Sequence, residues 1–226
     1  MAKFSPKEYD AWYETPLGRL CDRLEKEAVF SLFKPKGLVL DIGCGTGNYT
    51  LELARQGRKV VGIDSSFEMI AFAKRKAENE NLPVDFVAGS GEAMPFKSNA
   101  FHGAMAVTAL CFIANPERMI AETERILKMD GTIVVGELNK FSYWAFLRRL
   151  KGWLKKSAYR KARFYSIKTV RRMLQNMGFK NLYWSSCLYF PPINSSWLLK
   201  QWQFFEIIGK KLFPENGAFI VIAGRK

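Results

Sequence analysis

The feature that most constrains this chain is an apolar run that breaks into three glycines, with an acidic residue ending the next apolar run. Residues 39–47 read Val-Leu-Asp-Ile-Gly-Cys-Gly-Thr-Gly, and Asp64 ends the run Val60–Asp64. Continuous aliphatic residues are typical of a buried parallel strand, and glycines after it let a ligand lie against bare backbone. A helix beginning near Asn48 would point its free N–H groups at that ligand, and Asp64 would accept both hydroxyls of a ribose. The pattern predicts a nucleoside site.

The spacing of the glycines decides which kind of nucleoside site this is. The dinucleotide fingerprint G-x-G-x-x-G needs its third glycine at position 48, where the chain has Asn48. The triphosphate loop needs a lysine, and none occurs between Leu38 and Lys59. What remains, D-x-G-x-G-x-G from Asp41 to Gly47, resembles motif I of the class I S-adenosylmethionine (SAM) dependent methyltransferases.

Further motifs follow in the order that this family has. Ser65 and Glu68 form a capping box that is expected to open a helix after the second strand. Residues 84–96 resemble the third strand and adenine loop of the ubiquinone and menaquinone methyltransferase-like (type 11) branch, and residues 101–113 resemble its fourth strand. The helix after the second strand has apolar residues on one face, at Met69, Ile70, Ala73 and Ala77.

Another helix and strand are marked after the fourth strand. Asn115 is a capping residue, Pro116 suits the first turn of a helix, and Glu117 suits its positive end. Gly131 is expected to stop this helix, and residues 132–137 are expected to form strand five. A later helix is expected over residues 167–177, between a Ser166 cap and a Gly178 stop.

The resemblance implies a fold, a cofactor and a set of site residues. The fold is α/β: a doubly wound, Rossmann-like, mostly parallel seven-stranded sheet with helices on both faces and an antiparallel last strand, which agrees with the alternation of strands and helices. The cofactor is SAM, its product is S-adenosylhomocysteine, and no metal is implied. The cofactor-binding residues on this resemblance are Tyr13, Arg19, Asp41, Gly43, Cys44, Gly45, Gly47, Asp64, Ser65, Ser90, Gly91, Glu92 and Thr108.

Two residues depart from the family pattern. Where the family usually has an aspartate in the adenine loop, this chain has Ser90, so a neutral hydroxyl or the backbone would bind the adenine amino group. The family's Phe-Asp pair at the start of strand four is Phe101-His102 here, and His102 is the single histidine of the sequence. Because ligands bind at the carboxyl ends of parallel strands, we expect His102 to lie away from the site and not to act as a base.

Length and composition favour one globular enzyme. The 226 residues, 48% of them hydrophobic, predict a single methyltransferase domain over residues 1–226 that needs no metal or disulfide to fold. Within it we expect an N-terminal helical cover (1–36), a SAM-binding core (37–137) and acceptor-side insertions at 138–165 and 191–215. The four cysteines are scattered and no apolar run reaches the length of a membrane span, which favours a cytoplasmic location.

The charge divides at the end of strand five. Up to Glu137 the sequence has 17 Lys and Arg against 19 Asp and Glu; beyond it there are 18 against 2, and together the halves give the net +14 of this basic protein. No acidic residue occurs between Leu138 and Phe205. A half with this charge attracts anions.

The first insertion is expected to contain a cationic amphipathic helix. Its apolar positions are Tyr143, Phe146, Leu147, Leu150, Trp153 and Leu154, and its basic positions are Arg148, Arg149, Lys151, Lys155 and Lys156. Two interpretations stay open: a lid whose charges are solvated, or contact with an anionic surface or substrate. The second insertion is aromatic, with Trp197, Trp202, Phe204 and Phe205, and is expected between the last two strands as a wall around the acceptor.

The chemistry of SAM explains why few catalytic residues are needed. The methyl group on the sulfonium is electrophilic, so the protein mainly holds a nucleophile in line and keeps water out. Glu137, at the carboxyl end of strand five, is the candidate general base, and Thr108 is a candidate wall of the pocket. Both also suit structural or cofactor contacts.

Absent motifs narrow the acceptor. Methylation of base amines generally uses Asn or Asp before Pro-Pro and an aromatic, whereas strand four is followed by Thr108-Ala109-Leu110-Cys111. We therefore expect methyl transfer to a small or amphiphilic acceptor, anionic or presented at a membrane, with peripheral contact to anionic lipid. Two alternatives stay open: an RNA methyltransferase that uses the basic half, and a SAM-binding regulator without catalysis. The sequence leaves open which atom is methylated and how many copies assemble.

Overall fold

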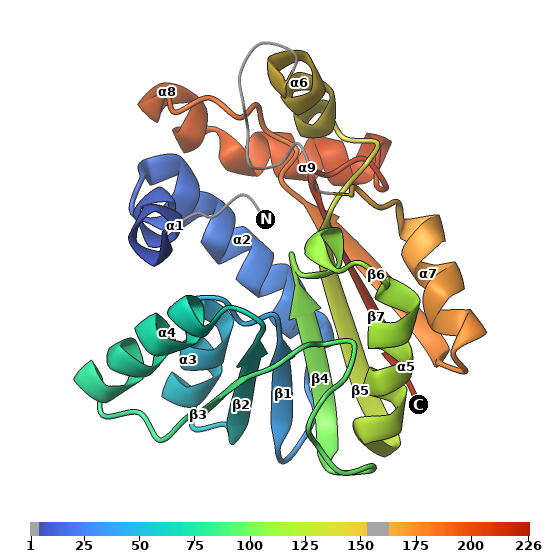
Figure 1. Ribbon diagram of the computed structural model, residues 1–226. Helices are drawn as coiled ribbons and strands as arrows, with labels where there is room; N and C mark the ends of the chain where they lie inside the picture. The colour runs from blue at the N-terminus through green and yellow to red at the C-terminus, as the bar shows by residue number, and fades with distance from the viewer. Residues whose placement is uncertain (1–4, 153–162) are drawn as a thin grey trace.

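In the computed structural model, residues 5–152 and 163–226 are described, with the backbone alone for 148–152. Within these ranges seven strands form one sheet in the order β3-β2-β1-β4-β5-β7-β6 (Figure 1). The strands are β1 (Val39–Ile42), β2 (Val60–Asp64), β3 (Asp85–Ala88), β4 (Phe101–Val107), β5 (Leu127–Leu138), β6 (Lys180–Cys187) and β7 (Phe219–Arg225). The helices are α1 (Pro6–Tyr13), α2 (Pro16–Leu32), α3 (Asn48–Arg55), α4 (Phe67–Asn79), η1 (Leu110–Phe112), α5 (Pro116–Ile126), α6 (Tyr143–Gly152), α7 (Ile167–Asn176), α8 (Ser196–Lys200) and α9 (Trp202–Leu212).

The directions of the strands confirm the predicted fold class. β1, β2, β3, β4 and β5 pair in parallel, whereas β7 runs antiparallel to both β5 and β6. The chain moves outward from β1 through β2 to β3 and then returns to place β4 on the other side of β1. Such a reversal opens a crevice at the carboxyl ends of the strands, where open α/β sheets bind ligands. The fold therefore locates the site above β1, β2 and β4.

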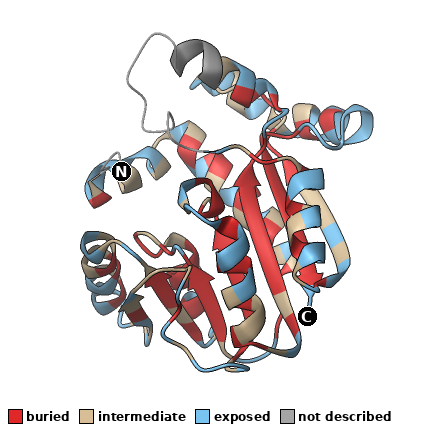
Figure 2. Ribbon diagram, turned by 45° about the vertical axis from the view of Figure 1, so that its right-hand side comes forward, coloured by how far each residue is buried: buried red, intermediate tan, exposed pale blue. Residues whose placement is uncertain are grey.

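Both faces of the sheet are covered by helices, and the central strands between them are buried (Figure 2). On one face α5 and α7 pack through Met119, Ile120, Val170 and Leu174 against alternate residues of the central strands. On the other face α2 and α3 supply Leu24, Val29 and Leu53. Burial on both faces explains why β1, β4 and β7 read as continuous apolar runs rather than alternating ones.

Several predicted element boundaries are wrong. β4 ends at Val107 rather than at residue 113, because Thr108 adopts a left-handed φ of 50°, and α5 ends at Ile126 rather than at Gly131. α4 is capped by Ser66, whose side chain accepts the N–H of Met69, while Ser65 is exposed. Strand β5 begins at Leu127 rather than at Thr132, because Asp130 adopts a left-handed φ of 61° and lets the chain turn without ending the strand. The caps of α5 and α7 are confirmed: Asn115 and Ser166 accept backbone N–H groups at the expected helix starts.

The first insertion is helical, but the predicted apolar face is wrong. Trp144 and Ala145 are buried, whereas Tyr143 and Phe146 are each 56% exposed. The indole N–H of Trp144 donates to the C=O of Phe190 at 2.6 Å, and the two rings meet edge to face. This contact turns α6 so that Tyr143 and Phe146 point outward. The predicted positions Trp153, Leu154, Lys155 and Lys156 lie outside the described residues, as do the side chains of residues 148–152.

The second insertion lies between β6 and β7, as predicted, and forms α8 and α9. Together with α6 these helices gather above the carboxyl ends of the parallel strands (Figure 1). Within residues 5–152 and 163–226, no helix combines the length and the apolar character needed to cross a bilayer.

We predict that Trp144 anchors the first insertion. Trp144→Ala should lower the free energy of unfolding by about 3 to 5 kcal/mol, because it removes a large buried ring and its hydrogen bond. Tyr143→Ala, the neighbouring exposed position, should stay within about 0.5 kcal/mol. Chemical denaturation of both variants measures the difference, and equal losses would contradict the anchoring role.

Candidate functional site

The glycine loop begins where β1 ends and is shaped by left-handed backbone angles. Gly43, Gly45 and Gly47 have φ values of 71°, 53° and 81°, a region that L side chains rarely adopt. The N–H of Gly43 donates to the C=O of Ile63 at 2.7 Å, which ties the loop to β2. α3 then begins at Asn48 as predicted, with Gly47 in the cap position and no side-chain cap hydrogen bond. The N–H groups of Gly43, Cys44, Gly45 and Gly47 bond within the protein and fix the shape of the loop, and the start of α3 lies beside it with its positive dipole end toward a ligand.

Asp64 lies beside this loop at the end of β2. Its Oδ2 accepts the N–H of Gly45 at 2.9 Å and its Oδ1 accepts the N–H of Ser66 at 2.8 Å. An ionised carboxylate has about four acceptor positions, so these two bonds fix its orientation and leave about two others. The free positions match the two hydroxyls of a ribose.

The space around the three glycines tests whether SAM fits here. A Cβ atom at Gly43 would lie 2.7 Å from the Cβ of Ala109, and one at Gly47 would lie 3.2 Å from the ring of Phe86. Those two glycines permit close packing inside the protein. A Cβ at Gly45 would meet nothing within 4 Å, so its Cα faces open space next to the Asp64 carboxylate. This opening fits a nucleoside lying against the backbone, and the residues present suit the implied cofactor.

Asp41 and Cys44 support the loop from below. Asp41 is 2% exposed, and its Oδ2 accepts the hydroxyl of Thr50 in α3 at 2.6 Å. Burial raises the pKa of Asp41 to about 7; the nearby Asp64 charge adds to the rise, and the bond from Thr50 offsets part of it. Burial likewise raises the pKa of the Cys44 thiol, which lies in a small core with Ile70 and Phe86. Direct contact of these two side chains with the cofactor stays a prediction.

The predicted adenine loop follows β3 and is internally braced. The hydroxyl of Ser90 accepts the N–H of Glu92 at 3.1 Å, and Oε1 of Glu92 accepts the N–H of Asn115 at 2.5 Å. Gly91 lies close to Ile42 at the end of β1, since a Cβ there would approach its side chain to 3.1 Å. The loop therefore sits next to the glycine loop, and its adenine contacts stay a prediction.

The N-terminal helix α1 is fastened over the glycine loop by residues that the sequence did not reveal. Asp10 accepts the hydroxyl of Thr46 at 2.5 Å and pairs with the ammonium group of Lys76 in α4 at 2.7 Å. Lys76 also donates to Oδ1 of Asn48 at 2.9 Å. We call this group, Asp10, Thr46, Asn48 and Lys76, the α1 latch. Its members are up to 66 positions apart, so no local pattern marks them.

The two predicted cofactor residues of the N-terminal cover differ in placement. The hydroxyl of Tyr13 lies 3.0 Å from that of Tyr9, and burial raises the pKa of Tyr13 well above its ordinary value. Arg19 is exposed on α2. Ser65, also predicted to bind the cofactor, is exposed beside Asp64. Contact of these three residues with SAM stays a prediction.

Thr108 follows β4 in a backbone conformation that is unusual for a β-branched residue. Its φ is 50°, and its N–H donates to the C=O of Gly136 at 2.7 Å. Left-handed conformations of this kind cost free energy and persist where the surroundings impose them, often at functional sites. The strained turn lies at the carboxyl end of β4, next to Ala109, which packs on Gly43. Its position agrees with the predicted pocket wall.

Glu137 is fully buried near the carboxyl end of β5, beneath η1. Neither carboxylate oxygen has a hydrogen bond of acceptable geometry within the described residues. Burial raises the pKa of Glu137 to about 8, and the Cys111 thiol and nearby backbone N–H groups offset only part of the rise. The carboxyl group is therefore mainly protonated at neutral pH and is shielded from solvent.

His102 lies at the amino end of β4, as predicted, beside Lys128 and Gly37. Its Nε2 is 3.2 Å from the ammonium nitrogen of Lys128. This end of the sheet is opposite the glycine loop, so His102 is too far away to contact a ligand bound at that loop.

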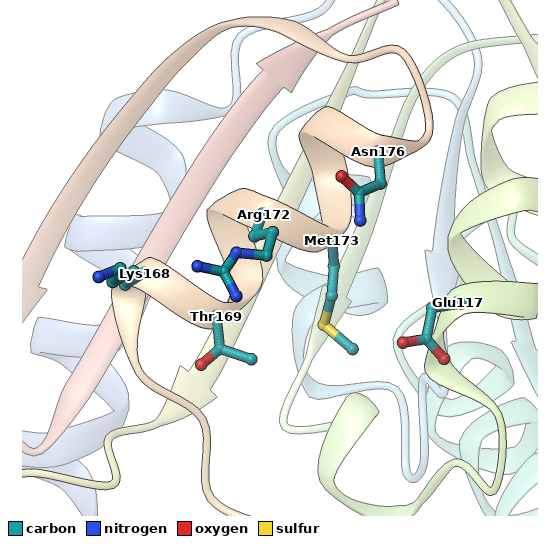
Figure 3. A pocket seen from close by; sticks show the side chains of 6 residues that line it. All are labelled: Glu117, Lys168, Thr169, Arg172, Met173 and Asn176. Atoms are coloured by element: carbon teal, nitrogen blue, oxygen red, sulfur yellow. The ribbon is translucent and has the colours of Figure 1, made fainter.

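A separate hollow lies between α5 and α7 (Figure 3). It is lined by Glu117, Lys168, Thr169, Arg172, Met173 and Asn176. None of these residues belongs to the glycine loop, the adenine loop or the α1 latch, and the hollow is not the cofactor site.

Together the doubly wound fold, the glycine loop and the Asp64 carboxylate define a nucleoside-binding α/β protein. Comparison with known proteins makes the class specific: residues 40–135 match the family described as the methyltransferase domain. An uncharacterised protein of Methanocaldococcus jannaschii is 33% identical over 176 residues, which cover 78% of this chain and 79% of that protein. A demethylmenaquinone methyltransferase of Renibacterium salmoninarum is 32% identical over 124 residues, 55% of this chain and 50% of that protein.

A solved structure agrees over nearly the whole chain. A SAM-dependent methyltransferase of Thermotoga maritima superposes with a TM-score of 0.76 at 27% identity, covering 97% of this chain and 95% of that one. The chain belongs to the class I SAM-dependent methyltransferases. It spans about three fifths of the length of the first curated relatives that it matches, which are mycobacterial.

We predict that Glu137 makes stability fall as the pH rises. The unfolded carboxyl group ionises near its ordinary pKa of 4.5, whereas the folded one holds its proton to about pH 8, so the folded state binds more protons between these values. The contribution of Glu137 to stability is therefore greatest below about pH 4.5 and declines toward pH 8. Glu137→Gln, which stays neutral, should raise the free energy of unfolding at pH 8 by a few kcal/mol and much less at pH 4. Chemical denaturation of both chains between pH 4 and pH 8 measures their free energies of unfolding. A difference between the two that does not change with pH would contradict the raised pKa of Glu137.

Proposed function

We propose that this chain transfers the methyl group of SAM to a small or amphiphilic acceptor that is anionic or presented at a membrane. The observation that supports SAM as the methyl donor is the open space at Gly45 beside the Asp64 carboxylate, whose orientation two hydrogen bonds fix. Membership in the methyltransferase family supports SAM as the nucleoside. We assign Asp64 to the ribose, the Ser90–Glu92 loop to the adenine and α1 to the cover.

In this proposal the protein acts mainly by positioning. SAM supplies an electrophilic methyl group, and an acceptor held in line with it needs little further activation. The glycine loop and Asp64 hold the nucleoside, and the α1 latch holds α1 across the loop to exclude water. Thr108 forms a rigid wall because its left-handed turn is held by Gly136.

The role of Glu137 as a general base stays a prediction. A pKa of about 8 is close to physiological pH, which suits proton transfer. Its complete burial beneath η1 means that an acceptor would reach it only after η1 moves.

Two observations support the acceptor class. The half of the chain that follows Glu137 carries 18 basic and 2 acidic residues, which favours an anionic acceptor or surface. The insertions that hold α6, α8 and α9 lie above the carboxyl ends of the strands and are rich in aromatic residues, which suits an apolar body. A demethylmenaquinone methyltransferase among the relatives agrees with an amphiphilic acceptor.

A transfer experiment tests the acceptor class directly. The purified chain is incubated with SAM labelled in the methyl group and a cell extract, which is then separated into lipid, small-molecule and RNA fractions. We expect label in the lipid or small-molecule fraction. Label in RNA would support the RNA alternative that the basic charge keeps open, and tight SAM binding without any transfer would support the regulator alternative.

We predict that Asp64 is needed for the cofactor. Asp64→Ala should weaken SAM binding by about tenfold or more, because each hydrogen bond to a charged group contributes about 1.5 to 3 kcal/mol. Asp85→Ala is the matched control, since Asp85 is exposed at the amino end of β3. Calorimetric titration with SAM measures both affinities. Equal affinities in a folded Asp64→Ala variant would overturn the assignment of the site.

A further inference from the structure

Helix α9 carries large apolar residues on its outer side as well as toward the core. It fully buries Glu206 and Gly209, and Trp202 and Phe205 pack half-buried against the core. Large apolar residues are among those that it exposes: Phe204 is 58% exposed, Ile207 68% and Leu212 61%. A helix on a water-soluble protein normally keeps its apolar stripe toward the core.

Specific contacts hold α9 in this orientation. Oε1 of Glu206 accepts the N–H of Tyr189 at 2.7 Å. Gly209 lies against the ring of Tyr189, where a Cβ atom would come within 2.3 Å of the ring carbons. Rotating α9 to bury Ile207 and Leu212 would break the Glu206 bond and force a side chain into Tyr189. The outward apolar face is therefore built into the fold.

Neighbouring segments extend this apolar surface. Trp197 of α8 is 69% exposed, and Phe213 just after α9 is 60% exposed. Of the 15 large hydrophobic residues exposed in the described part of the chain, 10 belong to the two insertions. We call the surface made by Trp197, Phe204, Ile207, Ile208, Leu212 and Phe213 the α8–α9 face. A concentration of exposed apolar residues of this kind marks an interaction site.

The charges around the α8–α9 face indicate the partner. Lys200, Lys210 and Lys211 are exposed beside it, whereas Glu206 is buried. Glu215 is the one acidic residue exposed in the half of the chain after Glu137. Aromatic and aliphatic side chains bordered by lysines are typical of helices that lie in the interface of an anionic bilayer. Protein interfaces, by contrast, are depleted in lysine.

We propose that the α8–α9 face docks on the surface of an anionic lipid bilayer. The apolar side chains enter the boundary between headgroups and acyl chains, and the lysines lie at the anionic headgroups. This places the carboxyl ends of the parallel strands toward the lipid, because α8 and α9 lie above them (Figure 1). The inference goes beyond methyl transfer, since bilayer binding would hold even for an acceptor that dissolves in water.

Sedimentation of the full chain with lipid vesicles tests the proposal. One set of vesicles is phosphatidylcholine alone, and in the other about one lipid in three is phosphatidylglycerol. We expect recovery with the acidic vesicles and little with the neutral ones. The double variant Ile207→Ser with Leu212→Ser should bind the acidic vesicles about tenfold more weakly or worse, because two exposed apolar side chains no longer enter the bilayer.

Controls distinguish docking on lipid from loss of the fold and from self-association. Met129→Ser removes an equally exposed apolar side chain, 76% exposed in the strand β5 segment at the opposite edge of the sheet, and should bind as the unaltered chain does. The double variant should bind SAM with unchanged affinity in calorimetry. That result would show that the variant folds and that a loss of vesicle binding is independent of the cofactor site. Equal binding of the double variant, absence of binding to acidic vesicles, or a dimer in sedimentation equilibrium that the double variant abolishes would each overturn the proposal.

Discussion

The carboxylate of Asp64 holds the architecture of the site together. It accepts one N–H from the glycine loop and another from the turn into α4, so a single side chain joins the ends of β1 and β2 to the starts of two helices. The glycine loop needs this support, because three left-handed residues within five positions have no regular hydrogen-bond ladder of their own. The opening at Gly45 exists because the loop is held in this shape.

The sequence predicts this part of the molecule well because the physics is local. Only glycine adopts the loop's backbone angles at little cost, so its spacing marks the turn, and buried parallel strands on either side must be continuously apolar. The caps at Asn115 and Ser166 are likewise local, since each side chain bonds an N–H three residues ahead. Where two adjacent serines both satisfy such a pattern, as at Ser65 and Ser66, only the path of the backbone selects one.

The sequence does not predict features that depend on distant contacts. The orientation of α6 follows from the bond between Trp144 and the backbone of Phe190, which lies 46 positions away. The α9 orientation depends in the same way on Tyr189 and Glu206. In both helices the hydrophobic pattern alone indicates an apolar face but not whether the protein buries it. Polar groups that must be satisfied, rather than apolar area, decide the rotation of these helices.

The α1 latch has a consequence for how the cover moves. Thr46 and Asn48 belong to the loop and helix start that would hold the nucleoside. Asp10 of α1 bonds Thr46 directly and reaches Asn48 through Lys76. α1 can move away from the glycine loop only when the Asp10–Lys76 ion pair and the bond to Thr46 break together, so the cover and the loop move as one unit.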